Sequence, residues 1–131
     1  MIKETINYTD YNGNERSMVC RFNLNKAEIM KMEMSVAGGM SERIQRIIDT
    51  HNQPELIEIF EDLIQRSYGV LTPDGNGFDK NPEHLKAFMA TEAYSELFMK
   101  LATDADFAAK FINGVFPSDL VKQAALVQGN N

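Results

Sequence analysis

The sequence has few of the residues from which most catalytic and cofactor sites are built. It contains a single cysteine, Cys20, so no internal disulfide can form, and it has no tryptophan. It also has no phosphate-binding loop, because Gly38-Gly39 follows a predicted helix rather than a strand and no P-loop lysine accompanies it. No apolar run approaches the ~20 residues of a membrane span, and the N-terminus shows no apolar signal segment. Together these absences favour a cytoplasmic protein.

Positive charge is also in short supply. Thirteen Lys and Arg residues stand against nineteen Asp and Glu residues, which gives a formal net charge of −6. Phosphate contacts need a basic surface, so we expect neither nucleic acid nor anionic membrane as a partner. The 131 residues suit one domain, and a hydrophobic fraction of 44% is enough to form a core.

The nucleophiles and histidines favour structural roles. Cys20 alternates with Met18 and Phe22 on the apolar face of a predicted strand, where a thiol is usually a small buried hydrophobic group. His51 and His84 have no nearby cysteine, serine elbow or carboxylate pattern. The many carboxylates fall on the polar faces of predicted helices. We therefore predict no catalytic residue and no cofactor.

The loop that begins at Asp74 superficially resembles a calcium-binding loop. Its spacing does not fit, because position six should be glycine and is Asp79, while position twelve should be glutamate and is Leu85. A plain turn is the better interpretation, and we predict no metal site.

The fold begins with a predicted β-hairpin. Residues 2–9 and 16–23 alternate apolar and polar side chains with period two, which places each apolar set on one face. Asn12-Gly13 between them is a strong hairpin signal, because both residues can adopt positive φ. An isolated hairpin is marginal in water, so its apolar face should lie on helices.

Helical periodicity dominates the rest of the chain. Asn25 and Glu28 form a predicted capping box, and the third predicted helix, with Phe60 in its apolar stripe, is the most clearly amphipathic. The first three helices are expected from Asn25 to about Ala37, from Ser41 to near Thr50 and from Pro54 to Tyr68. A fourth follows Asn81-Pro82, with Leu85, Phe88 and Met89 inside, and two more begin at Thr91 and Thr103. The last begins at Pro117, and its apolar side consists of Leu120, Val121, Ala124 and Ala125.

The stretch from Thr91 to Pro117 predicts two consecutive helices. Thr91 and Thr103 are expected to cap them through their hydroxyls, and Asp106 completes a predicted capping box with Thr103. Asn113-Gly114 is expected to end the second helix, because glycine accepts the left-handed conformation of a helix stop.

These elements predict an α+β fold, mostly α, in which an N-terminal β-hairpin packs on a bundle of about six short helices. Residues 1–131 are expected to form a single domain. Its predicted parts are the hairpin at 1–24, a helical part at 25–127 that includes a loop from Val70 to Lys80, and a disordered tail at 128–131.

Methionine is unusually frequent, with eight in the chain. Ile29 and Met32 share one side of their predicted helix, whereas Met30 and Met34 point roughly the opposite way, and Met99 lies off the main stripe of its helix. One interpretation is burial of both helix sides in the core or in an oligomer contact. The other is a partner surface formed by Met30, Met34 and Met99, because methionine adapts to varied apolar helices.

Several segments, taken in order, resemble the tail assembly chaperones of long, flexible-tailed bacteriophages and prophages, mainly from Gram-positive hosts. The resemblance covers most of the chain up to about Leu120, and its motifs encode no chemistry. The residues that carry it are Phe22-Asn23-Leu24, Leu63-Ile64, Ser67-Tyr68-Gly69, Asp74-Gly75, Phe78, Thr91-Glu92-Ala93-Tyr94-Ser95-Glu96-Leu97-Phe98, Leu101-Ala102-Thr103-Asp104-Ala105-Asp106, Asn113-Gly114 and Pro117.

The resemblance implies a non-enzymatic chaperone in the cytoplasm of the bacterial host. Such proteins coat the long helical tape measure protein and keep it soluble, and they are displaced when tube subunits polymerise. The implied partners are the tape measure protein and, as a further candidate, the major tail tube protein, with self-association left open. The alternatives are another phage structural component, such as a tail completion or head–tail joining protein, and a small enzyme.

Overall fold

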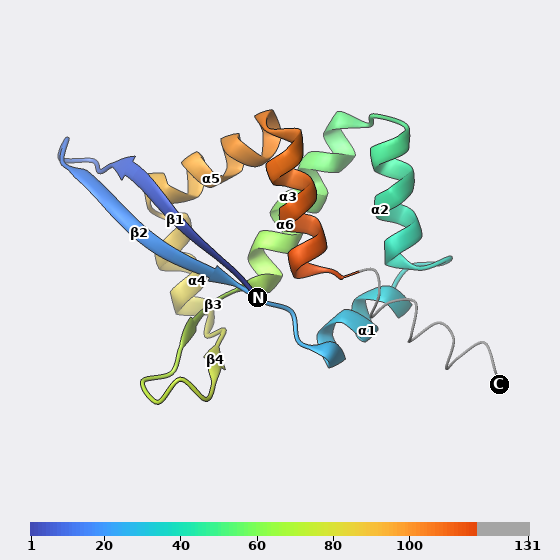
Figure 1. Ribbon diagram of the computed structural model, residues 1–131, viewed down its shortest axis with the longest axis horizontal. Helices are drawn as coiled ribbons and strands as arrows, with labels where there is room; N and C mark the ends of the chain where they lie inside the picture. Colours follow the sequence, from blue (N-terminus) through green and yellow to red (C-terminus); the bar gives the residue numbers. More distant parts are fainter. Residues whose placement is uncertain (118–131) are drawn as a thin grey trace.

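The computed structural model describes residues 1–117 and contains a four-stranded sheet and six helices in that range (Figure 1). The prediction of an α+β fold, mostly α, is confirmed. The predicted helix from Pro117 and the predicted tail at 128–131 fall outside the described part. The elements in chain order are β1 (Ile2–Thr9), β2 (Glu15–Phe22), α1 (Lys26–Met34), α2 (Met40–Asp49), α3 (Gln53–Ser67), β3 (Tyr68–Leu71), β4 (Phe78–Asp79), α4 (Pro82–Met89), α5 (Glu92–Thr103) and α6 (Ala105–Val115).

The predicted hairpin is confirmed, with its apolar face inward. β1 and β2 pair antiparallel in an unbroken register from Ile2↔Phe22 to Thr9↔Glu15. The turn differs from the expected one, because only Gly13 has positive φ, at 85°, and Asn12 does not. The Asp10 carboxylate instead accepts hydrogen bonds of 2.9 Å from the backbone N–H groups of Asn12 and Asn14, which organises a longer loop.

The segment 70–80, predicted as a loop, contributes two further strands to the sheet. β3 pairs with the end of β2 through Arg21↔Gly69 and Phe22↔Tyr68, and β4 pairs with β3, so the strand order is β1-β2-β3-β4. Gly69 permits this arrangement because a β-carbon there would lie 2.6 Å from the ring of Phe78. The prediction was wrong because these short strands are stabilised by tertiary pairing and carry little alternation of their own.

An aromatic cluster fills the core between the sheet and the helices. α5 and α6 contact β1, and α4 contacts β3. Phe22 of β2 stands at the centre of the cluster, with ring centroids 5.3 Å from Phe111, 5.7 Å from Tyr68 and 6.1 Å from Phe88. Tyr68 and Phe88 stack at 4.4 Å. These edge-on and stacked contacts join β2, β3, α4 and α6 into one core.

Four predicted helix signals in the 91–117 stretch are wrong: the hydroxyl caps of Thr91 and Thr103, the capping box of Thr103 with Asp106, and the stop at Asn113-Gly114. The Thr91 hydroxyl makes no capping bond to its helix and donates instead to the Phe88 carbonyl at 2.7 Å. Thr103 is the last residue of α5, and Asp104 caps α6 by accepting from the Phe107 N–H at 3.1 Å, because a carboxylate oxygen is a stronger acceptor.

Gly114 does not end the second of these helices. α6 continues to Val115, and Gly114 lies inside it where the Ile2 side chain approaches closely. A glycine at this position serves close packing between the helix and the start of β1 rather than a helix stop.

The α1–α2 connection shows two further differences. The capping box of Asn25 and Glu28 is present, but α1 ends at Met34 rather than near Ala37. Gly38 and Gly39 both have positive φ, at 83° and 96°, which reverses the chain. Since Gly39 has no side chain to cap α2, the Glu33 carboxylate accepts from the Ser41 N–H at 2.9 Å and from its hydroxyl at 2.8 Å.

Candidate partner-binding site

The candidate nucleophile Cys20 is a buried core thiol. Its side chain is 1% exposed, and burial, followed by the nearby charge of Glu4, raises its pKa to about 11. A thiol with that pKa is protonated at neutral pH, so it cannot act as a ready nucleophile.

The other polar candidates form local structure. The Asp74 carboxylate accepts from the Thr72 hydroxyl at 2.6 Å and from the Asn76 N–H at 3.0 Å, and these bonds lower its pKa while they organise the turn. His84 Nε2 lies 3.1 Å from Asp79 Oδ2. Within residues 1–117 no group of three or more His, Cys, Asp or Glu side chains is placed to hold a metal ion. No helix in that same range has the length and apolar character to cross a membrane.

The three methionines predicted at a partner surface are all exposed. Met30 and Met34 are 41% and 62% exposed on the same face of α1, and Met99 is 57% exposed on α5. Met32, by contrast, is buried, as the helical geometry predicts. α1 and α5 lie at separate places in the fold (Figure 1), so Met99 does not join Met30 and Met34 in one continuous patch.

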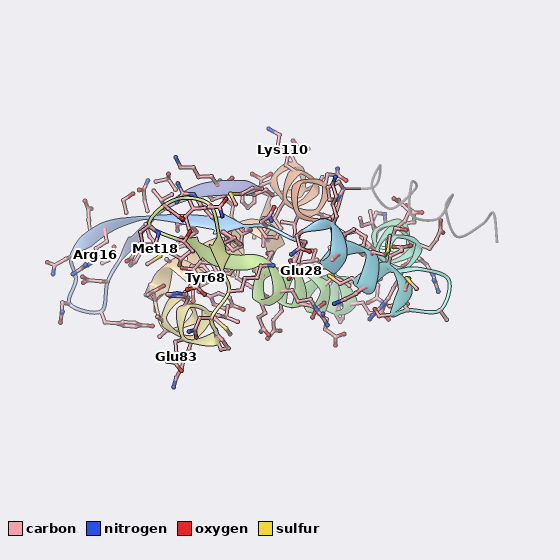
Figure 2. The ribbon with its side chains drawn as sticks, turned by 90° about the horizontal axis from the view of Figure 1, so that it is seen from below. Arg16, Met18, Glu28, Tyr68, Glu83 and Lys110 are labelled. Carbon is pink, nitrogen blue, oxygen red and sulfur yellow. The ribbon has the colours of Figure 1, made fainter. Side chains whose placement is uncertain are left out.

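α1 is held in place by contacts at both ends. Glu28 of its first turn binds Lys80, whose Nζ lies 2.8 and 2.9 Å from the two carboxylate oxygens, and Glu28 also accepts from the Asn25 N–H at 2.9 Å. Figure 2 shows Glu28 on α1, well separated from Arg16 in the hairpin. Together with the Glu33 cap on α2, these contacts fix the inner side of α1 and leave the face with Met30 exposed.

A groove of about 450 Å³ runs along the outer edge of β1. Four consecutive β1 residues line it, although their side chains alternate between the two faces of the sheet, so the groove follows the edge of the strand. The opposite wall comes from α5 and the start of α6. The lining residues are Glu4, Thr5, Ile6, Asn7, Glu96, Leu97, Met99, Lys100, Thr103 and Phe107.

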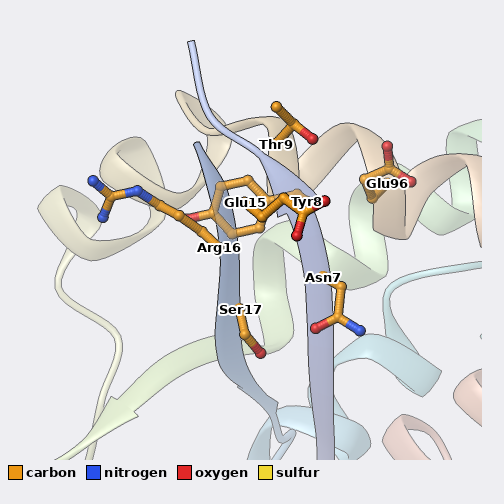
Figure 3. A pocket seen from close by; sticks show the side chains of 7 residues that line it. All are labelled: Asn7, Tyr8, Thr9, Glu15, Arg16, Ser17 and Glu96. Atoms are coloured by element: carbon orange, nitrogen blue, oxygen red, sulfur yellow. The ribbon is translucent and has the colours of Figure 1, made fainter. Parts of the chain in front are cut away.

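A second concavity of about 600 Å³ continues this groove toward the hairpin loop. The two share Asn7 of β1 and Glu96 of α5, and Figure 3 shows these two side chains on neighbouring elements. Arg16 in its wall is already bound to Asp10, with Nε 2.5 Å from Oδ2. The other lining residues are Tyr8, Thr9, Glu15 and Ser17.

A model of a family described as phage tail assembly chaperone matches residues 1–128. The chain belongs to the phage tail assembly chaperone family. This family consists of assembly proteins rather than enzymes. No curated protein and no solved structure matches the chain.

In this tail assembly chaperone several of the residues that carry the family resemblance lie in the core. Phe22 and Tyr68 meet in the aromatic cluster, and the cluster extends through Phe88 to Tyr94 and Phe98, with ring centroids 5.7 and 6.1 Å apart at these two steps. Residues far apart in the sequence thus meet in one core.

Among the residues that line the groove, helical geometry singled out Met99 as a predicted partner residue. The β1 residues beside it, Thr5 and Asn7, were not singled out. The sequence feature that indicated this surface was the regular strand at residues 2–9, for which the sequence predicted a pairing strand on one side only. The position of this strand beside α5 depends on packing between segments that are about ninety residues apart.

Proposed function

We propose that this tail assembly chaperone binds the tape measure protein in the cytoplasm of the bacterial host and keeps it soluble during tail assembly. The observation that carries the proposal is the exposure of Met30, Met34 and Met99 on a protein of this family. Long helical proteins with apolar stripes need such cover, and flexible thioether side chains adapt to many sequences. The major tail tube protein is the second proposed partner, because tube subunits would displace the chaperone.

The exposed fractions set the expected magnitude. Complete burial of a methionine side chain contributes roughly 1.5–3 kcal/mol relative to full exposure. The three methionines are about half exposed in the free protein, so only this exposed part remains to be buried on binding. Each would therefore contribute about 1 kcal/mol, and all three about 3 kcal/mol. Their loss should therefore weaken binding on the order of 100-fold.

The test replaces Met30, Met34 and Met99 together with serine and measures affinity for a purified tape measure fragment from the same phage. We expect weaker binding and a nearly unchanged melting temperature. The control variant carries serine at three other exposed apolar positions, Ile48, Ile57 and Met89.

Two results would contradict the proposal. The first is wild-type protein that neither binds the fragment nor raises its soluble yield on co-expression. The second is stable incorporation of the chain into purified virions, which would favour a tail completion or head–tail joining protein. If instead the methionine variant binds as tightly as the control, the tape measure protein uses another surface.

A further inference from the structure

We propose that the open edge of β1 binds an extended, basic segment of a partner protein as an added strand. This binding mode concerns an extended segment rather than a helix, and it does not require the partner to be the tape measure protein. Strand addition uses backbone hydrogen bonds for affinity and neighbouring side-chain pockets for selectivity.

The hydrogen-bonding pattern identifies the backbone groups at this edge. In an antiparallel pair, alternate residues direct both backbone groups to the partner strand, and the residues between them direct theirs away. The Asp10 N–H donates to the Asn14 carbonyl at 2.8 Å, which places even-numbered β1 residues in the ladder with β2. On the other side of β2, the Asn23 N–H donates to the Ser67 carbonyl at 2.8 Å. Odd-numbered β2 residues thus direct their backbone groups away from β1, which agrees with even-numbered residues forming the β1–β2 ladder. The backbone groups of Thr5, Asn7 and Thr9 therefore point to the open edge.

The edge is regular enough to accept another strand. β1 pairs with β2 residue for residue, without a bulge, and it contains no proline. Bulges and prolines are devices by which proteins usually block such edges. The strand order leaves β1 without a second neighbour among the strands of residues 1–117, and the hairpin projects beyond α5 (Figure 1). From Thr5 to Thr9 the strand offers roughly 15 Å of edge at ~3.3 Å per residue.

The groove beside this edge selects the charge of the segment. Glu4, Glu15 and Glu96 line the two concavities, and none of them forms an ion pair within the described part of the chain. Of the two lining cations, Arg16 is bound to Asp10, and Lys100 Nζ lies 4.1 Å from the centroid of the Phe107 ring. Within residues 1–117, the two concavities therefore hold three carboxylates without an ion pair against the ammonium of Lys100, and Ile6, Leu97 and Phe107 add apolar groups to the lining.

A basic segment with alternating apolar side chains matches this surface better than a second copy of the chain does. Antiparallel pairing of two β1 strands would bring two sets of the carboxylates of Glu4 and Glu96 together. Like charges across a strand pair are destabilising, which disfavours that dimer.

The first experiment uses a synthetic six-residue peptide of alternating lysine and valine, with a glutamate–valine peptide of equal length as the control. We expect the lysine peptide to bind the full-length protein and the glutamate peptide to bind at least about tenfold more weakly, with the difference shrinking at high salt. Equal binding of the two peptides, or no binding of the lysine peptide at millimolar concentration, would overturn the proposal.

Matched variants separate the backbone from the side chains. Asn7→Pro removes the outward N–H and leaves the bonds to β2, because proline is tolerated where the N–H faces solvent. The first control, Asn7→Ala, keeps that N–H. The second control, Val19→Pro, removes an outward N–H on the opposite edge of the hairpin. Val19 lies beyond the two β2 residues that pair with β3. We expect Asn7→Pro to weaken peptide binding at least about fivefold. Asn7→Ala and Val19→Pro should bind like the wild type.

A measurement on the wild type keeps the proposal testable if a proline variant unfolds. Amide hydrogen exchange at Thr5, Asn7 and Thr9 should slow when the lysine peptide is added, while exchange at Val19 should not change. Slowed exchange confined to other residues would overturn strand addition at β1. The proposal would also be overturned if the wild-type protein forms a dimer in solution and Asn7→Pro dissociates it. That result would show that the edge of β1 binds a second copy of the chain.

Discussion

The buried thiol of Cys20 predicts a specific dependence of stability on pH. The pKa of this thiol rises from a reference of 9.0 to about 11, mainly because burial disfavours the thiolate. In the unfolded chain the thiol ionises near its ordinary pKa. Below pH 9 both states carry the proton, so the stabilising contribution is fully present. As the pH rises toward 11 the unfolded chain loses its proton first, and the contribution is lost.

The magnitude follows from the size of this pKa shift. The free energy of unfolding should fall by up to ~1.4 kcal/mol per pH unit between pH 9 and 11 on account of Cys20 alone. Tyr68 and Tyr94 also have raised pKa values, chiefly because of burial, and they contribute in the same direction above pH 10. Comparison with Cys20→Ala cancels most of the tyrosine contributions, because both proteins contain these tyrosines and burial is the main cause of their raised pKa values.

The assay is urea denaturation of wild type and Cys20→Ala, with reductant present, at several pH values from 7.5 to 11. At pH 7.5 we expect the wild type to be more stable by about 1 kcal/mol, the cost of a small cavity. That advantage should shrink above pH 9 and reverse by about pH 11, where the thiol is forced to ionise. A constant difference over the whole range, or fast labelling of Cys20 by a thiol reagent in the native state, would refute the assignment as a buried thiol.

Two further predictions concern α3 and the start of α2. Phe60→Ala should lower the free energy of unfolding by roughly 3–5 kcal/mol in chemical denaturation, because Phe60 is 1% exposed. Ile57→Ala on the same helix, 38% exposed, should cost less, and a Phe60 loss under about 1 kcal/mol would show that α3 does not face the core. Glu33→Ala should cost about 1 kcal/mol in thermal denaturation, because it removes the acceptor for Ser41. Glu33→Gln keeps an acceptor oxygen and should lose less, so equal losses would contradict the capping role.

Local periodicity and capping chemistry predicted most of the fold. The alternation in residues 2–9 and 16–23, the box of Asn25 and Glu28, and the stripe around Phe60 each act over a few neighbouring residues, so they can be read directly from the chain. Met89 was expected inside and is exposed, because it lies at the margin of its apolar stripe.

The features that could not be predicted depend on competition or on distant contacts. Asp104 caps α6 in place of its neighbour Thr103, and periodicity does not rank two adjacent acceptors. β3 exists because Gly69 and Tyr68 meet β2. The groove beside β1 likewise requires the placement of α5. Helical geometry placed Met30 and Met34 opposite the buried side of α1, but it did not decide whether that side is covered.

The packing of the first strand against the last described helix affects how the chain folds during synthesis. A β-carbon at Gly114 would lie 2.5 Å from Ile2 Cδ1, and Phe111 contacts the ring of Phe22. Neither contact can form until α6 has left the ribosome, so the hairpin emerges long before its apolar face is covered. Folding that waits for contacts of such long sequence separation is slow. We therefore expect the nascent chain to remain without its completed core until α6 has emerged from the ribosome.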